Sequence, residues 1–120
     1  MNVSDQPAPF ARVVIIDRQP VRALELELLL TSTLGDRARV STFERLEDAL
    51  QAEAEGFDLV LIDDNTASRS AIAQHFGNNE RAIVAWVSDA PPRGGEALTW
   101  LIRPVGRADL TELFYRLKFP

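Results

Sequence analysis

The chain has 120 residues, of which 46% are hydrophobic and 26% charged, as is typical of a single globular domain. It has no cysteine and one histidine, His75, so disulfides, thiolate metal sites and a cysteine nucleophile are excluded, and His75 is assigned no role. The formal net charge of −5 disfavours direct binding of nucleic acid or of an anionic membrane. No apolar run is long enough to span a bilayer and no secretory signal opens the chain, so we expect a cytoplasmic protein.

The first half of the chain predicts strands that alternate with helices. Residues 1–10 contain two prolines and are expected to form a flexible leader to a domain that spans residues 11–120. The apolar run at 12–16 predicts a strand covered on both faces, and residues 39–43 predict a shorter outer strand. A second helix is expected over 46–54, ending at Gly56. The first helix is expected to run from Pro20 to Gly35, with its buried face formed by Val21, Leu24, Leu28 and Leu34 and widened by Leu26, Leu29 and Leu30.

The second half continues the alternation. Residues 57–62 predict a strongly apolar strand that ends in Asp63, and residues 66–76 predict a short helix. Further strands are expected at 82–87 and 98–102, on either side of a loop rich in proline and glycine. In the last helix, Asp109 and Glu112 have the spacing of a capping box, and the buried face is expected to contain Leu110, Leu113, Phe114 and Leu117.

Two aspartates follow the most apolar strands. Strands connected through helices imply crossover connections and a parallel sheet with helices on both faces. The first and third strands should then lie side by side at the centre, and they end at Asp17 and Asp63. Ligands of such sheets bind at the carboxyl ends of the central strands, where these two carboxylates are expected to meet. The alternative is that both residues have only a structural role, as ordinary polar strand ends or helix caps.

Three segments resemble the receiver domains of response regulators. They are VVIID at 13–17, DLVLID at 58–63 and IRPV at 102–105, and the resemblance extends over about residues 12–117. It implies an α/β, flavodoxin-like three-layer sandwich with a five-stranded parallel sheet in the order 2-1-3-4-5. In that family an aspartate after the third strand accepts a phosphoryl group from a histidine kinase, beside Mg²⁺, a Ser or Thr, and a Lys that precedes a cis-proline.

The resemblance assigns roles to individual positions. Asp63 matches the phosphoacceptor, Asp17 the first metal-binding acid, and Pro104 the cis-proline. The Ser/Thr position falls on Val87 or, with a shift of one residue, on Ser88, which is taken as a switch-like residue. Trp100 lies near the family's aromatic switch position.

Arginines replace two functional residues of the family pattern. Arg18 stands at the second acid position and Arg103 at the lysine position, so the formal charge of the pocket changes from minus two to zero. A cation about 4 Å from an added positive charge meets roughly 4 kcal/mol of repulsion at an intermediate dielectric. We therefore expect no cofactor, or only weak Mg²⁺ binding by Asp17, Asp63 and the Asn65 carbonyl. Arg18 either points into the pocket or turns to solvent.

The connection before the fifth strand is also short. It contains Pro91-Pro92 and Gly94-Gly95, which do not suit a helix interior, so the fourth helix is predicted to be missing or strongly shortened. Loss of this helix would uncover apolar surface. We therefore expect a homodimer, with Leu98, Trp100, Leu113 and Phe114 as candidate contacts wherever they are not buried internally.

The leading hypothesis is an atypical receiver that acts as a signalling and protein-interaction module with impaired or absent phosphorylation of Asp63. Its partner would be a kinase, an output domain or another regulator, with no binding of nucleic acid or membrane. The alternative is a functional receiver phosphorylated on Asp63 with Mg²⁺, such as the N-terminal regulatory domain of a transcription regulator. An enzyme is not expected, because the motif at 63–66 is similar to a phosphatase nucleophile loop but has Asn65 in place of its second aspartate.

Overall fold

A computed structural model describes residues 10–52, 56–66, 70–72, 83–91 and 99–116 of the chain. The predictions made for residues 1–9, His75, Leu98 and Leu117 lie outside these described residues. Phe10, placed at the end of the expected leader, is half-buried, with the guanidinium carbon of Arg39 4.1 Å from the centre of its ring.

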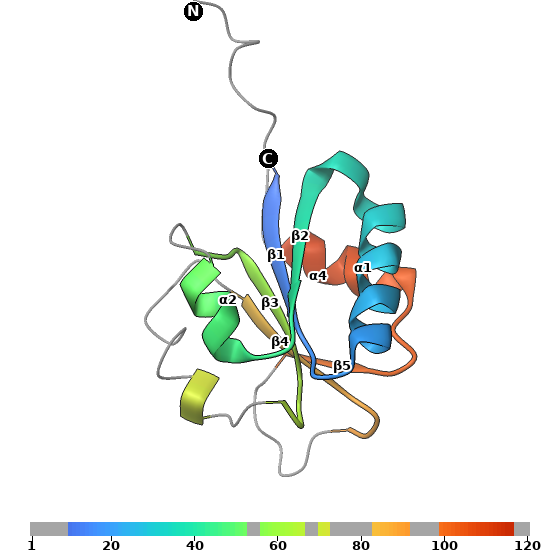
Figure 1. Ribbon diagram of the computed structural model, residues 1–120. Coiled ribbons are helices and arrows are strands. Elements are labelled where there is room, and N and C mark those ends of the chain that lie inside the picture. Colours follow the sequence, from blue (N-terminus) through green and yellow to red (C-terminus); the bar gives the residue numbers. More distant parts are fainter. Residues whose placement is uncertain (1–9, 53–55, 67–69, 73–82, 92–98, 117–120) are drawn as a thin grey trace, which may run out of the picture.

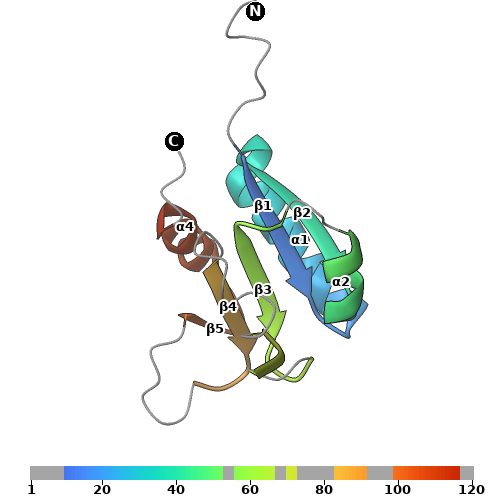
Figure 2. The ribbon, with the colours of Figure 1, turned by 90° about the vertical axis from the view of Figure 1, so that its left-hand side faces the viewer.

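The chain forms one sheet of five parallel strands in the order β2-β1-β3-β4-β5, which confirms the predicted flavodoxin-like α/β fold. Apolar runs place β1 and β3 at the centre, because such strands are stable only where both faces are covered. All five residues of β3 are buried. Figure 2 shows β1, β3 and β4 running in the same direction toward one edge of the sheet. The strands are β1 (Ala11–Ile16), β2 (Ala38–Phe43), β3 (Leu59–Asp63), β4 (Ile83–Ser88) and β5 (Thr99–Ile102).

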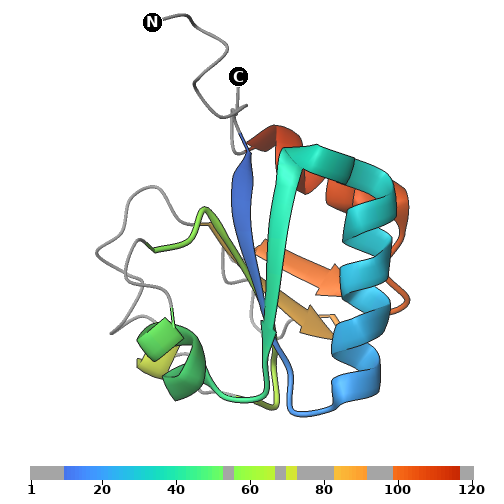
Figure 3. The same cartoon turned by 45° about the horizontal axis from the view of Figure 1, so that its top comes forward.

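Helices cover both faces of this sheet. The main elements are α1 (Pro20–Leu34), the short η2 (Gly35–Arg37), α2 (Leu46–Ala52) and α4 (Arg107–Arg116). Helices α1 and α4 pack on one face and α2 packs on the other (Figures 1 and 3). None of the described helices is both long enough and apolar enough to cross a membrane.

Two predicted segments between strands are described only in part. Residues 70–72 are helical, whereas Thr66, predicted as the start of that helix, lies in the turn after β3. Residues 89–91, which follow β4, form no helix. Residues 92–98 lie outside the described part of the chain, so the predicted loss of the fourth helix stays a prediction there; the helix labelled α4 is the C-terminal one.

The alternation of side chains along the strands creates two core layers. Val13, Ile15 and Leu61 point toward α1 and α4, while Val14 and Ile62 point toward α2. Successive side chains of a strand lie on opposite faces, so each central strand contributes to both layers. By the same alternation Asp63 continues the row of Leu61, which directs its carboxylate toward the α1 side.

Helix α1 buries a different stripe from the predicted one. Val21, Leu24 and Leu28 are 69%, 53% and 59% exposed, whereas Ala23 and Leu30 are buried. The prediction for Leu34 is confirmed, since it is buried, and Leu26 and Leu29 are half-buried. The sequence of α1 carries leucines around most of its circumference, so its periodicity alone does not select the stripe that meets the sheet.

This packing predicts different costs for two nearby leucines. Leu30→Ala is expected to lower the free energy of unfolding by about 3 kcal/mol, because it opens a cavity in a fully buried position. The matched change Leu28→Ala should alter it by less than about 0.5 kcal/mol. Urea unfolding followed by tryptophan fluorescence measures both values. Equal costs for the two variants would contradict the burial of Leu30 and the exposure of Leu28.

Helix α4 begins earlier than the predicted capping box. It starts at Arg107, and the Asp109 carboxylate accepts a hydrogen bond of 2.9 Å from the backbone N–H of Gly106. Asp109 is therefore the third helical residue that reaches back to the cap, not the cap itself. Leu113 and Phe114 are buried in the core, which removes two of the four candidate dimer contacts. Dimerisation stays a prediction.

Candidate functional site

Two buried carboxylates meet at the carboxyl edge of the sheet. Asp17 follows β1 directly and Asp63 ends β3; these residues are 5% and 2% exposed. Strands β1 and β3 are neighbours, with Ile16 paired to Ile62, so the residues that come next in both strands lie side by side. The two aspartates that the sequence placed at this edge are therefore brought together by strand register.

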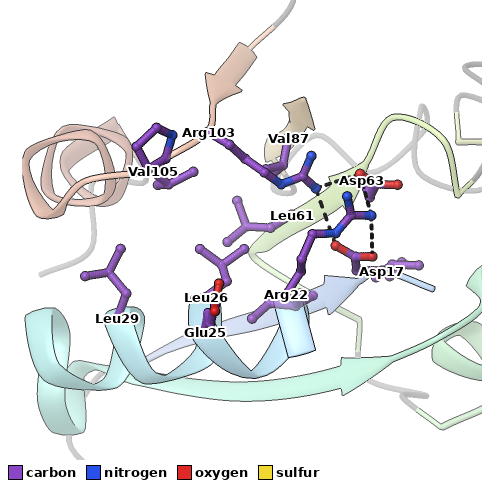
Figure 4. Close-up of a pocket in the computed structure, with 13 residues that line it drawn as sticks. Asp17, Arg22, Glu25, Leu26, Leu29, Leu61, Asp63, Val87, Arg103 and Val105 are labelled. Atoms are coloured by element: carbon purple, nitrogen blue, oxygen red, sulfur yellow. Dashed lines mark hydrogen bonds and ion pairs between the residues drawn. The ribbon is translucent and has the colours of Figure 1, made fainter. Parts of the chain in front are cut away.

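Two guanidinium groups bridge these carboxylates (Figure 4). Arg22 Nη2, from the first turn of α1, lies 3.0 Å from Asp17 Oδ1 and 3.3 Å from Asp63 Oδ1. Arg103 Nη2, which follows β5, lies 2.6 Å from Asp63 Oδ1 and 3.4 Å from Asp17 Oδ2. We call Asp17, Asp63, Arg22 and Arg103 the four-charge cluster. Its formal charges sum to zero.

Arg22, and not Arg18, supplies the second positive charge. The prediction of Arg18 as a basic pocket residue is wrong: its side chain is exposed, and its backbone N–H donates to Thr66 Oγ1 over 3.3 Å. The turn after β1 leads Arg18 outward, whereas α1 then brings Arg22 back over the edge of the sheet. Arg22 was not among the predicted site residues. Its position in the first turn of the helix that follows Asp17 is the feature of the sequence that could have indicated it. A hydrogen bond to Asp17 raises the pKa of Arg22, against the opposing effect of burial, so this guanidinium stays charged near neutral pH.

Backbone and hydroxyl donors occupy the carboxylate oxygens as well. Asp17 Oδ1 accepts the N–H of Gln19 at 2.8 Å. Asp63 Oδ2 accepts the N–H of Asn65 at 3.2 Å and the hydroxyl of Thr66 at 3.1 Å. Because the four oxygens of Asp17 and Asp63 all face donors, each carboxylate is held in place and its charge is compensated.

Mg²⁺, which the resemblance implies for this site, does not fit these surroundings. Mg²⁺ is bound by oxygen ligands, usually one or two carboxylates together with water. The oxygens of Asp17 and Asp63 already face guanidinium, N–H or hydroxyl donors, and the described residues offer no group of three acidic, histidine or cysteine side chains placed to hold a metal ion. Asn65 is exposed and turns a donor, its N–H, toward Asp63. The positive charges next to the two carboxylates are already those of Arg22 and Arg103.

The predicted switch-like residue Ser88 is directed away from Asp63. Its hydroxyl donates to Asp64 Oδ2 over 2.8 Å and accepts the N–H of Ala90 over 3.2 Å. Val87 instead pairs with Asp63 in the sheet register and packs in the core layer of α1 and α4. The residue on the Asp63 side of β4 is thus apolar, and it has no hydroxyl to contact a group attached there.

The end of β5 and the residues after it form one side of the site. The Arg103–Pro104 peptide bond is cis. The backbone N–H of Arg103 donates to the carbonyl of Ser88 over 2.8 Å, which ties the end of β5 to the end of β4. Trp100 is half-buried, and its Nε1–H donates to the carbonyl of Ala90 over 2.9 Å. A switching role for Trp100 stays a prediction.

No protein-family model and no curated protein matches the sequence. Similar solved structures include an orphan response regulator from Helicobacter pylori, 22% identical with a TM-score of 0.72, with 92% of this chain and 99% of that one covered. The chemotaxis response regulator CheY4 of Vibrio cholerae is 16% identical with a TM-score of 0.69, and 90% and 98% of the two chains are covered.

A protein described as related to pilus assembly, from Burkholderia pseudomallei, is 17% identical with a TM-score of 0.72, and 90% and 89% of the two chains are covered. These likenesses span nearly the whole of each chain at low sequence identity, and they therefore concern the fold. The chain has the fold of response-regulator receiver domains.

Proposed function

We propose that the chain is a regulatory module of two-component-type signalling that works through protein contacts and without phosphorylation of Asp63. The receiver fold of the similar solved structures supports the regulatory role, since two of them are named as response regulators and share this fold. Its partner is a kinase, an output domain or another regulator.

The observation that carries the proposal is the pairing of Asp63 with two guanidinium groups. Phosphoryl transfer to a carboxylate needs a free oxygen in line with the donor and a divalent cation to neutralise the phosphoryl oxygens. In this chain Asp63 Oδ1 is 2.6 Å from Arg103 and 3.3 Å from Arg22, and Oδ2 accepts two further hydrogen bonds. A carboxylate held in this way is stabilised in its ground state, which makes it a poorer nucleophile toward a phosphoryl donor.

The competing function is that of a receiver phosphorylated on Asp63, for instance as the N-terminal regulatory domain of a transcription regulator. The position of Asp63 at the end of β3, beside a cis peptide bond at Pro104, favours this alternative. The absence of a hydroxyl at Val87 and the pairing of both guanidiniums with Asp63 favour the proposal instead.

Acetyl phosphate with Mg²⁺ distinguishes the two functions. The wild-type domain should keep its unmodified intact mass under conditions in which a conventional receiver, treated in parallel, gains a phosphoryl group. Asp63→Asn serves as the matched control, since it removes the acceptor oxygen with little change of shape. A phosphoryl group added to the wild type and absent from Asp63→Asn would establish the competing function.

A further inference from the structure

A groove lies between the beginning of α1 and the end of β2, at the carboxyl edge of the sheet (Figure 1). We call it the α1–β2 groove. Its volume is about 270 Å³, below the range of about 300–1,000 Å³ that is usual for small-molecule sites, so it suits the side chains of a docked segment better than a whole ligand. Its chemistry depends on Leu24 and Glu27 of α1, on Phe43 at the end of β2, and on Glu44.

The groove presents apolar surface to solvent. Leu24 is exposed and Phe43 is half-buried. Val21 and Leu28, about one turn before and one turn after Leu24, are exposed as well, so the apolar surface continues along the same side of α1. Apolar side chains gathered on one surface in this way usually mark a contact with another molecule.

Both walls of the groove are acidic. Glu27 lies on α1 and Glu44 follows β2, and neither forms an ion pair within the described part of the chain. Asp17 also lines the groove, but its charge is already matched by Arg22 at 3.0 Å. The groove therefore has two unmatched negative charges next to its apolar side chains, which favour an occupant that is both basic and apolar.

The end of α4 leads into a segment of this chemistry. The sequence at 116–119 is RLKF, in which Arg116 and Lys118 alternate with Leu117 and Phe119. In an extended segment, alternate side chains point to opposite sides. Both apolar side chains can then enter a groove together, while the long stems of the basic ones allow their charges to reach its acidic walls.

The segment of the same copy does not extend to the groove. Phe114 lies at the opposite end of β2, where the guanidinium carbon of Arg37 is 4.5 Å from the centre of its ring. The six residues of β2, about 20 Å in length, separate this point from the groove. Residues 117–119 lengthen the chain beyond α4 by at most about 11 Å. An occupant with this sequence therefore has to come from a second copy.

We propose that the α1–β2 groove binds residues 116–119 of a second copy of this chain. The two apolar side chains of the segment pack against Leu24 and Phe43, and its two basic side chains approach Glu27 and Glu44. Because the groove and the segment are different surfaces, the contact is heterologous, so one copy both provides a segment and accepts one. The contact stands whether or not the domain is phosphorylated, and it uses none of the dimer contacts suggested by the sequence.

Sedimentation velocity of the full chain tests the contact. A contact this small is weak, so we expect the wild type to self-associate with a dissociation constant on the order of 100 µM. Lys118→Glu and Glu27→Lys should each weaken self-association at least about tenfold, because each places like charges opposite one another. An equimolar mixture of the two variants should form heterodimers of about the wild-type strength, since one copy keeps an intact groove and the other an intact segment. A wild type that stays monomeric well above this concentration, or a mixture that does not associate, would overturn the proposal.

A fluorescently labelled peptide of residues 115–120, YRLKFP, tests the groove by itself, with anisotropy as the measurement. Leu24→Ala should weaken binding of the peptide at least about fivefold, whereas Leu28→Ala, equally exposed but outside the groove, should leave it unchanged. Glu25→Lys is the matched control for Glu27→Lys, since it makes the same change of charge on the same helix without lining the groove. Equal responses within either pair would show that the peptide binds elsewhere.

Discussion

Replacing Arg103 with methionine is expected to lower the free energy of unfolding by about 3 kcal/mol, since it leaves buried carboxylates with too little positive charge. Arg103 Nη2 lies 2.6 Å from Asp63 Oδ1, and Asp63 is almost completely buried. Methionine keeps much of the apolar length of arginine, so the loss reports mainly on charge. Urea unfolding at neutral pH, followed by circular dichroism, measures the change.

Arg18→Met is the matched control for this effect. It removes the same charge at the same carboxyl edge of the sheet, but the Arg18 side chain is exposed, so the cost should stay below about 0.5 kcal/mol. Adding Asp63→Asn to Arg103→Met should recover part of the loss, because the carboxylate left without its partner is then removed as well. Equal costs for Arg18→Met and Arg103→Met would show that the cluster does not stabilise the fold.

The second large effect concerns Mg²⁺. Arg18→Asp combined with Arg22→Ala restores an acid at the second acid position and removes one bridging guanidinium, which should increase Mg²⁺ affinity at least about tenfold. A positive charge about 4 Å from the ion contributes roughly 4 kcal/mol of repulsion at an intermediate dielectric, so a tenfold gain already allows for strong solvent screening. Isothermal titration calorimetry measures the affinity of the variant and of the wild type.

The control changes the net charge equally at a distant surface. Arg107→Ala combined with Arg116→Asp alters two exposed arginines of α4, which are remote in sequence from Asp17 and Asp63, and should leave Mg²⁺ binding at the wild-type level. Equal gains in the two double variants would mean that net charge, and not the local guanidinium, limits binding. Tight Mg²⁺ binding by the wild type would show that Arg22 and Arg103 do not exclude the ion.

Much of the fold could be predicted because its determinants are local. Runs of apolar residues such as those of β1 and β3 are stable only in a covered parallel sheet, so they fixed the central strands and placed Asp17 and Asp63 at one edge. The stripe buried by α1 could not be predicted in the same way. Leu24 and Leu28 are as apolar as Leu30, and only the position of the helix over the sheet distinguishes them.

The sequence by itself determined the alternation of strands and helices, the central position of β1 and β3 and the placement of the two aspartates at one edge, because an apolar run and the aspartate that follows it are features of a short stretch of chain. Only the tertiary structure decided which arginine joins them. Arg18 is next to Asp17 in the chain yet points to solvent, whereas Arg22 returns on the first turn of α1 to within 3.0 Å of Asp17. Which arginine reaches the aspartates depends on how the turn after β1 directs α1 across the sheet, and no local sequence pattern determines that direction.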